Sequence, residues 1–283
     1  MHNMLRRTFT DPYFIGFRVW QKIVMFFIVG SCLSLTLESV QSLADKYALV
    51  FDWSEWITVA FFTIDATANI AFAPRPLKYI FSIWGFIDLI SVLPSYLMLL
   101  NLTAVRGTKI IRLIRMARVL RVLKLAHAAA AEVHGSGNRR SSPLVANLKI
   151  YCIIFFAVLM ISSTAMYYFE GGLYDPETLK AGQMAIEAAT PAGQTAAVFM
   201  PVDPISELPI TADKRFFDSI PSAMWWCIET MTTTGYGDMF PVTVLGRIIA
   251  AITMMCGLTL FAILFNLINK TMMVLLFAEK HTD

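Results

Sequence analysis

Charged side chains are scarce in this sequence: they make up 15% of its 283 residues, whereas 57% of the residues are hydrophobic. A soluble domain carries more charge and less apolar surface, so this balance indicates a membrane protein. The formal net charge is only +3, which gives no argument for a nucleic-acid partner. Neither a nucleophile–base set nor a metal-ligand cluster is evident, so we expect no enzyme, no cofactor and no small-molecule substrate.

Cysteine is also rare. The four cysteines all fall inside apolar runs, and their spacing fits no metal site; they are Cys32, Cys152, Cys227 and Cys256. We interpret them as small buried hydrophobic residues. No cleavable signal peptide is evident either, because the first apolar run is too long for one and lacks a small-residue cleavage site.

Apolar runs of about 20 residues, the length needed to cross a bilayer core, are abundant instead. One shorter run near 219–231 is too brief to cross and suits a re-entrant helix buried in protein. The predicted fold is therefore an all-α membrane protein with six transmembrane helices and one re-entrant helix. The six expected spans are 20–41, 54–73, 79–100, 104–125, 144–169 and 242–277.

Residues 135–143 form the clearest linker, rich in Gly and Ser, and divide the chain into a four-span half and a two-span half. Basic residues gather in the connections expected on one side, which predicts a multi-pass protein of the cell membrane with both termini cytoplasmic. The 170–218 segment is acidic on balance, with Glu170 and Asp203 among its acids. It should face outward, where it either concentrates cations or is a solvated loop. We expect no soluble domain at either end.

A motif at 232–238, after the re-entrant run, carries the strongest chemical signal. Gly235 and Gly237 flank Tyr236 and let the backbone alternate between torsions that other residues avoid. Such a strand turns successive carbonyl oxygens toward one axis, and rings of carbonyls from several copies replace the water shell of a cation. The three threonines before Gly235 can add hydroxyl ligands. A lone Gly-Tyr-Gly is also a common loop tripeptide, but its place between membrane-length segments favours an ion site.

The run 219–226 followed by 232–238 resembles the pore helix and selectivity filter of potassium channels. The resemblance implies that K⁺ is a permeant ion, held only by backbone carbonyls. The residues that would bind it are Thr233, Thr234, Gly235 and Tyr236, with Gly237 completing the filter. Thr234 departs from the commonest family pattern, which has valine, and this leaves the fine selectivity open.

Glu229 precedes Asp238 by nine residues, a spacing similar to that of small two-span bacterial potassium channels. Two carboxyls brought together behind a filter do not both ionise cheaply, so one pKa should rise and the pair should share a proton. That bond would brace the filter; alternatively, Glu229 only caps or bonds local backbone. The expected filter support consists of Trp225, Trp226, Glu229 and Asp238.

Basic residues recur at every third position through the fourth expected span, with mostly apolar residues between them. Charges inside a membrane are expensive, and moving one through the field is worth about 2.3 kcal/mol per 100 mV. In an α-helix this spacing makes a slowly winding stripe, whereas in a 3₁₀ helix the residues line up. A basic surface helix or a nucleic-acid-binding helix would not need a strict period of three. The residues are Arg106, Lys109, Arg112, Arg115, Arg118, Arg121 and Lys124.

This ladder resembles the voltage-sensing helix of voltage-gated cation channels, and the resemblance makes its residues gating charges. It also places an aromatic cap at Phe62, past which the arginines would move one at a time. The expected counter-charges are Glu38 and Glu55 on the outer side and Asp65 and Asp88 on the inner side. Phe62 as a lipid-facing ring and Glu55 as an interfacial charge remain alternatives. Asn69 stands where many family members carry a basic residue.

Gly257 lies at the middle of the last span. A mid-helix glycine weakens a helix by up to ~1 kcal/mol relative to alanine and marks a place where it bends. By the family resemblance it is the gating hinge. Close helix packing through a small residue is the alternative.

The resemblance covers residues 20–270 and implies a voltage-gated potassium-selective channel, a homotetramer embedded in membrane lipids. The alternatives are a voltage-dependent cation channel of relaxed selectivity and a secondary transporter, which would show repeated halves. The expected domains are an interfacial arm at 1–19, a voltage-sensor domain at 20–126, a cytoplasmic linker at 127–145, a pore domain at 146–277 and a tail at 278–283.

Overall fold

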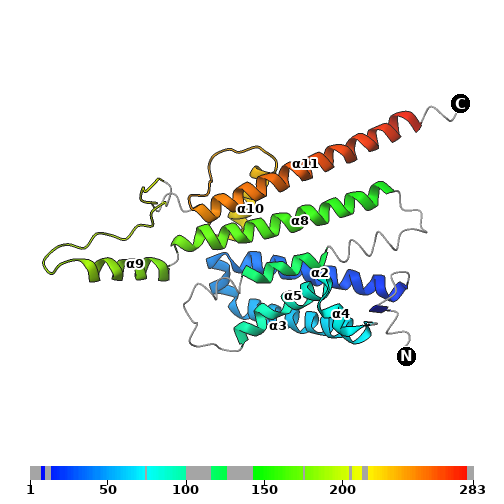
Figure 1. Cartoon of the computed structure of the whole chain (residues 1–283), viewed down its shortest axis with the longest axis horizontal. Helices are drawn as coiled ribbons and strands as arrows, with labels where there is room; N and C mark the ends of the chain where they lie inside the picture. Colours follow the sequence, from blue (N-terminus) through cyan, green and yellow to red (C-terminus); the bar gives the residue numbers. More distant parts are fainter. Residues whose placement is uncertain are drawn as a thin grey trace.

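The computed structural model describes residues 8–9, 14–73, 75–99, 116–125, 143–174, 176–203, 206–211 and 216–278. In these ranges the chain forms helices joined by short connections and one long extended segment (Figure 1). No sheet forms within them, because the one strand-like pairing is an isolated bridge between Val202 and Pro209. The prediction of an all-α protein is therefore confirmed for the described residues.

Three helices of the described chain are long and apolar enough to cross a membrane: α2 (Ile15–Glu38), α8 (Pro143–Glu170) and α11 (Val244–Ala278). A fourth apolar helix, α5 (Ile83–Leu99), is shorter. The helix α3 (Gln41–Phe72) is long but carries charged residues along its length. With these apolar helices, the chain has the build of a membrane protein.

The helices α2, α3 and α5 form one bundle with η2 (Arg118–Leu123), a short 3₁₀ helix. Ile28, Phe62 and Val122 are fully buried at its centre. The second expected span, 54–73, falls within α3, which already begins at Gln41, shortly after the end of α2 at Glu38. The helix α3 has a kink at Tyr47, whose φ is −120° and ψ 26°.

The second half of the chain consists of α8 and α11 with the short helix α10 (Ile220–Met231) packed against both (Figure 1). Ser219 begins α10 as its N-cap and accepts a hydrogen bond from the Ser222 backbone N–H, while Pro221 occupies the first turn. These local signals explain why the helix starts where the sequence predicts. With 12 residues, α10 is too short to cross a membrane.

The two halves share one hydrophobic core. Ile220 of α10 and Met160 of α8 lie in the same buried cluster as Ile28 and Leu35 of α2. The Ile220 backbone N–H also donates a 2.8 Å hydrogen bond to the Ser39 hydroxyl, at the end of α2. The four-helix half therefore docks on the two-helix half of the same chain.

The helix α9 (Pro176–Ala189) lies at one end of the molecule, while the first turn of α2 and the last turns of α11 both lie toward the opposite end (Figure 1). Next to α9, the extended segment near 190–211 returns to the body through an Arg247–Asp203 ion pair of 2.9 Å. Asp203 and Glu170 are buried, 6% and 4% exposed. The alternative of a simply solvated loop therefore does not hold for these two acids, because each has polar partners in the fold.

The cysteines divide into two groups. Cys32 and Cys227 are buried as predicted, but Cys152 is exposed and Cys256 is half-buried. The last two lie on faces of α8 and α11 that this single chain does not cover.

Candidate functional site

The basic ladder is described only at its C-terminal end, where Arg118 and Arg121 lie in η2 and Lys124 follows directly. The 3₁₀ helix has three residues per turn, so residues three apart project from the same face. Of the two geometries that the spacing allows, the described part adopts the one that aligns the charges. The other ladder residues, Arg106, Lys109, Arg112 and Arg115, lie outside the described residues.

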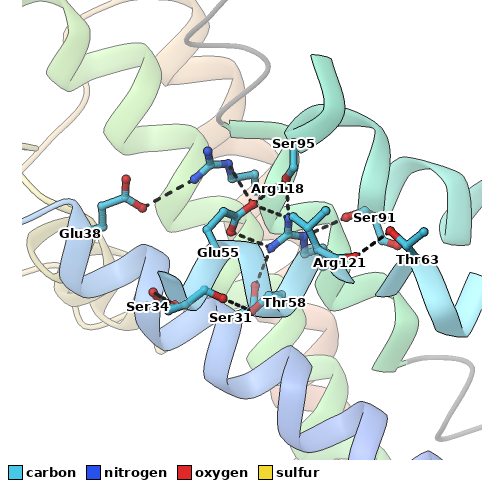
Figure 2. A network of polar contacts seen from close by, with 12 residues as sticks. Ser31, Ser34, Glu38, Glu55, Thr58, Thr63, Ser91, Ser95, Arg118 and Arg121 are labelled. Atoms are coloured by element: carbon cyan, nitrogen blue, oxygen red, sulfur yellow. Dashed lines mark hydrogen bonds and ion pairs between the residues drawn. The ribbon is translucent and has the colours of Figure 1, made fainter. Parts of the chain in front are cut away.

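Arg121 is buried in the bundle, with 1% of its surface exposed (Figure 2). Its guanidinium donates to both carboxylate oxygens of Glu55, at 2.7 and 3.1 Å. The remaining donors bond the Ser31 and Ser95 hydroxyls and the Ser91 carbonyl. All five N–H donors of the guanidinium are therefore used. These hydrogen bonds offset the desolvation cost of a charged side chain inside the bundle.

Glu55 is the centre of an outer acidic site (Figure 2). Besides Arg121, it accepts a 2.6 Å hydrogen bond from Ser95 and lies 3.6 Å from the Arg118 guanidinium. Glu38 lies 3.7 Å from the other side of Arg118. Glu55 is therefore a paired acid within the bundle, and the alternative of a lone interfacial charge is excluded.

Phe62 separates two cations. Its side chain is completely buried. The Arg121 Cζ lies 5.7 Å from the ring centroid and the Lys124 Nζ lies 4.8 Å from it, both within cation–π range. The lipid-facing alternative for Phe62 is therefore excluded, and the ring marks a boundary between Arg121 and Lys124.

Lys124 occupies an inner acidic site, where its Nζ lies 2.9 Å from Asp65 and 3.0 Å from Asp88. Both acids are buried, at 4% and 7% exposed. Trp20 of α2 donates its indole N–H to Asp65 at 2.8 Å, and Tyr79 donates its hydroxyl to Asp88 at 2.6 Å. No sequence pattern singled out Trp20, which lies 45 residues from Asp65, or Tyr79, which lies nine residues from Asp88.

Tyr79 belongs to α4 (Pro76–Ile80), a short helix between α3 and α5. Its hydroxyl is a neutral donor to the buried Asp88 carboxylate. Asn69 contributes a weak 3.4 Å hydrogen bond to the same Asp88 oxygen. Neutral donors thus stand where many family members place a cation.

The 232–238 strand alternates between left-handed and right-handed backbone conformations, that is, between positive and negative φ. Thr233, Gly235 and Gly237 have φ values of 59°, 57° and 80°, whereas the residues between them have negative φ. This alternation is what turns successive carbonyls toward one side of a strand. A left-handed β-branched residue such as Thr233 is strained, so the surrounding structure must impose it.

Trp225 and Asp238 support this strand from the side. The Trp225 indole N–H donates to Asp238 at 3.1 Å, and the Trp225 ring stacks on the Tyr236 ring with centroids 5.9 Å apart. Trp226, also predicted as support, points instead into the core, where it packs edge-to-face on Phe217. Adjacent helical residues face different directions, so one tryptophan reaches the filter and the other reaches the core.

Glu229 lies behind the strand and is 3% exposed. Its backbone carbonyl accepts the Thr234 N–H at 2.9 Å. One side-chain oxygen has no hydrogen-bond partner among the described residues. Burial and the nearby Asp238 carboxylate raise the pKa of the Glu229 carboxyl, in the direction the sequence predicts.

Glu170 is a residue that sequence reasoning missed. At the end of α8 it accepts hydrogen bonds from the backbone N–H of Val242 at 3.2 Å and of Thr243 at 2.9 Å, and from the Thr243 hydroxyl. A Cβ on Gly246 would overlap its carboxylate. Glu170 thus ties α8 to the start of α11, just beyond the filter. An acid that ends an apolar span, with a glycine early in the next span, was the available signal.

Gly257 is buried within α11, which continues unbroken as a helix on both sides of it. A Cβ at this position would lie 2.6 Å from the Met231 Cα, at the end of α10. Close packing alone therefore explains the glycine, and the hinge remains a prediction.

Together these parts offer two physical capabilities. One is a line of charges beside two acidic sites separated by a ring; the other is a strand whose carbonyls converge. In the described part of the chain, no group of His, Cys, Asp or Glu side chains is arranged to hold a metal.

Comparison with known proteins identifies the class. Residues 17–275 match the family model described as "Ion transport protein". Because the match covers most of the chain, the protein belongs to this family.

The similar relatives are named as potassium channels. A protein of Rhodopseudomonas palustris, provisionally named a potassium channel protein, is 27% identical over 258 residues, which is 86% of this chain and 50% of that protein. The human voltage-gated potassium channel KCNC3 is 30% identical over 215 residues, or 74% of this chain and 24% of that protein. A cyclic nucleotide-gated potassium channel of Rhizobium etli is 48% identical over 59 residues, 21% of this chain and 16% of that protein. The chain thus spans half or less of the length of these relatives.

Proposed function

We propose that the chain is a subunit of a voltage-gated, potassium-selective channel. Four copies would surround one pore, K⁺ would pass the carbonyls of the 232–238 strand, and no cofactor would be needed. The observation that carries the proposal is the pairing of two features in one chain. One is a filter-like strand whose φ is positive at Thr233, Gly235 and Gly237 and negative between them. The other is a basic 3₁₀ helix that lies across two acidic sites.

The membrane arrangement follows from the same features. Six spans, with the ladder in the fourth and α10 as a re-entrant helix, would place both termini in the cytoplasm of a cell-membrane protein. The start of α2 and the end of α11 lie toward the same end of the molecule, which agrees with an even number of membrane crossings (Figure 1). The relatives' names support potassium as the transported ion.

The sensor would act by charge exchange. Under a field that draws cations inward, Lys124 would leave the inner site and Arg121 would pass Phe62 to replace it. Each charge carried across the whole field contributes about 2.3 kcal/mol per 100 mV. In the conformation described here, Arg118 and Arg121 lie on the outer side of Phe62 and Lys124 lies on the inner side, which corresponds to an outward sensor.

A second candidate is a voltage-dependent cation channel of relaxed selectivity. Thr234 favours it, because its hydroxyl bonds the Thr232 hydroxyl at 2.8 Å and so adds a polar group beside the filter strand. The two candidates share gating and differ only in how the filter ranks cations.

Reconstitution in planar bilayers tests both. Voltage steps should switch the conductance, and reversal potentials under K⁺ on one side and Na⁺ on the other should strongly favour K⁺. Arg118→Gln should make the charge–voltage curve shallower by up to about one elementary charge per subunit. The exposed Arg75→Gln serves as the matched control and should leave the slope unchanged.

Equal permeability for K⁺ and Na⁺ would replace the first candidate with the second. Conductance without voltage dependence, or an unchanged slope in Arg118→Gln, would refute the role of the ladder. Saturating flux at low turnover would revive the transporter alternative.

A further inference from the structure

Thr233 is the residue of the filter strand whose backbone conformation is least favourable in itself, because it is β-branched and has a φ of 59°. Gly235 and Gly237 also have positive φ, but they carry no Cβ and adopt it freely. A left-handed β-branched residue persists only where the surrounding structure imposes that conformation. Thr233 therefore needs neighbouring contacts that favour its left-handed form.

The two residues on either side of Thr233 are bonded to each other through their side chains. The hydroxyl oxygens of Thr232 and Thr234 lie 2.8 Å apart. In an extended strand, residues i and i+2 are separated by roughly 6.6 Å along the chain. The two hydroxyls reach each other because the backbone curls at Thr233, and an extended Thr233 would separate them. We call this hydrogen-bonded pair the hydroxyl clasp.

The direction of the hydrogen bonds in the clasp follows from the number of protons. The Thr232 hydroxyl lies 2.8 Å from the Ile228 carbonyl oxygen and 3.2 Å from the Glu229 carbonyl oxygen. Neither carbonyl has a proton, so the Thr232 hydroxyl donates its single proton to them. Thr234 must therefore donate to Thr232, and the bonds run from Thr234 through Thr232 to the end of α10.

Backbone hydrogen bonds hold both ends of the curl on the same helix. The Thr232 N–H donates to the Ile228 carbonyl and the Thr234 N–H donates to the Glu229 carbonyl, each at 2.9 Å. The helix α10 is itself packed between α8 and α11. The residues before and after Thr233 are thus anchored to one packed helix, and the clasp closes the curl between them.

We infer that Thr234 is a positioning residue whose hydroxyl, through the clasp, holds Thr233 in the left-handed conformation that the filter requires. Valine, which the commonest potassium-channel pattern has at this position, carries no hydroxyl and cannot form the clasp. The inference rests on the proposed potassium-channel function. Its consequence is that the filter of this chain depends on the Thr234 hydroxyl to stay conducting while the channel is held open.

Bilayer recordings of the full chain test the inference through the rate at which the current decays during a sustained voltage step. Thr234→Val matches threonine in size but lacks the hydroxyl, and it should speed the decay about three- to tenfold, as expected for the loss of one hydrogen bond. Thr234→Ser keeps the hydroxyl and should decay within about twofold of the unmodified rate. This rescue separates the hydroxyl from a packing role of the side chain.

Thr232→Val removes the other half of the clasp. Because both valine variants break the same bond, the double variant should decay no more than about twofold faster than the faster single variant. If Thr234→Val does not conduct, Thr232→Val and Thr232→Ser decide the question in the same way. The matched control is Thr190→Val, since Thr190 follows α9 as Thr232 follows α10 and likewise bonds a carbonyl four residues earlier, at 2.7 Å. This control should decay at the unmodified rate.

The outcomes distinguish the inference from the proposed function. A decay rate in Thr234→Val within about twofold of the unmodified rate would overturn the inference and leave the proposed function intact. Failure of Thr234→Ser to restore the unmodified rate, or fully multiplicative effects of the two valine variants, would overturn it as well. An unmodified chain without voltage-dependent potassium current would overturn the proposed function and this inference with it.

Discussion

At the scale of single residues, this chain keeps the charge of Arg121 inside an apolar bundle by giving each N–H of its guanidinium a partner. Arg121 uses all five of its donors on Glu55, two hydroxyls and one carbonyl. Breaking a buried pair by removing one partner typically costs 3–5 kcal/mol, because the other charge stays buried. Glu55→Ala is therefore more disruptive than any change at an exposed acid.

Glu229 yields a prediction on pH. Its raised pKa means that the carboxyl keeps its proton at pH values where an ordinary glutamate has lost it, and the bond to Asp238 is available there. As pH rises through the raised pKa, two carboxylates face each other and the brace weakens. Filter inactivation should therefore speed up severalfold with rising pH, and Glu229→Gln should abolish this response in bilayer recordings.

The control for this experiment is Asp218→Asn, an exposed acid next to the start of the same helix. It should retain the pH response of the unmodified chain. If Glu229→Gln keeps that response too, the shared proton does not govern the filter.

At the scale of elements, the ladder needs the 3₁₀ form to work as a line. In η2, Arg118 and Arg121 repeat with the helix period, so one step of three residues brings the next cation to the same acidic site. In an α-helix the same step would also rotate the side chains by about 60° around the axis. The 3₁₀ segment therefore lets the helix exchange partners with little rotation.

A second element-scale prediction concerns the link between α8 and α11. Glu170→Gln preserves size but places an NH₂ group against backbone N–H donors of Val242 or Thr243. Each buried donor left without an acceptor costs about 1–3 kcal/mol. The variant should lower the thermal unfolding temperature of the purified protein and speed inactivation, because the segment after the filter loses its anchor.

Glu187→Gln provides the comparison, since this α9 acid bonds only the Gln183 side chain at the surface. It should unfold with the unmodified protein. A Glu170→Gln protein that unfolds at the same temperature would show that the brace is dispensable.

At the scale of the whole molecule, the bundle of α2, α3, α5 and η2 shares a single core with α8 and α10 of the same chain. The Ser39 hydroxyl accepts the Ile220 N–H and donates to the Thr36 carbonyl at 2.6 Å, so it satisfies the ends of two helices at once. Pro221, next to Ile220, has no N–H to offer. The contact therefore ties a helix without gating charges to the helix behind the filter.

This arrangement predicts that each sensor packs on the pore half of its own chain. Cysteines at Ser39 and at Ser219, the residue before Ile220, should be joined within one chain by a short bifunctional thiol reagent. The background replaces Cys32, Cys152, Cys227 and Cys256, and the readout is the mobility of a single cross-linked chain in a denaturing gel.

Co-expression of the two single-cysteine chains supplies the control and should give no cross-linked dimer. A dimer from that mixture, without the internal product from the double variant, would place each sensor on a neighbouring pore.

The sequence by itself determined the helical class of the described residues and the approximate limits of several apolar helices. Periodicity and span length depend on neighbours along the chain, so the start of α10 and the limits of α8 and α11 follow within a few residues. The glycines of the filter strand and the interval of three in the ladder are equally local signals. The start of α3 at Gln41 does not follow from the apolar pattern, because the first turns of this helix carry polar and charged residues.

Only the tertiary structure decided which partners meet. Trp20 and Tyr79 reach Asp65 and Asp88 across the bundle, Glu170 reaches Thr243 from another helix, and Ser39 caps a helix 181 residues away. Such contacts depend on how helices pack and rotate, and no local pattern encodes them. The sequence therefore named the charges and the filter, and the fold determined what holds each of them in place.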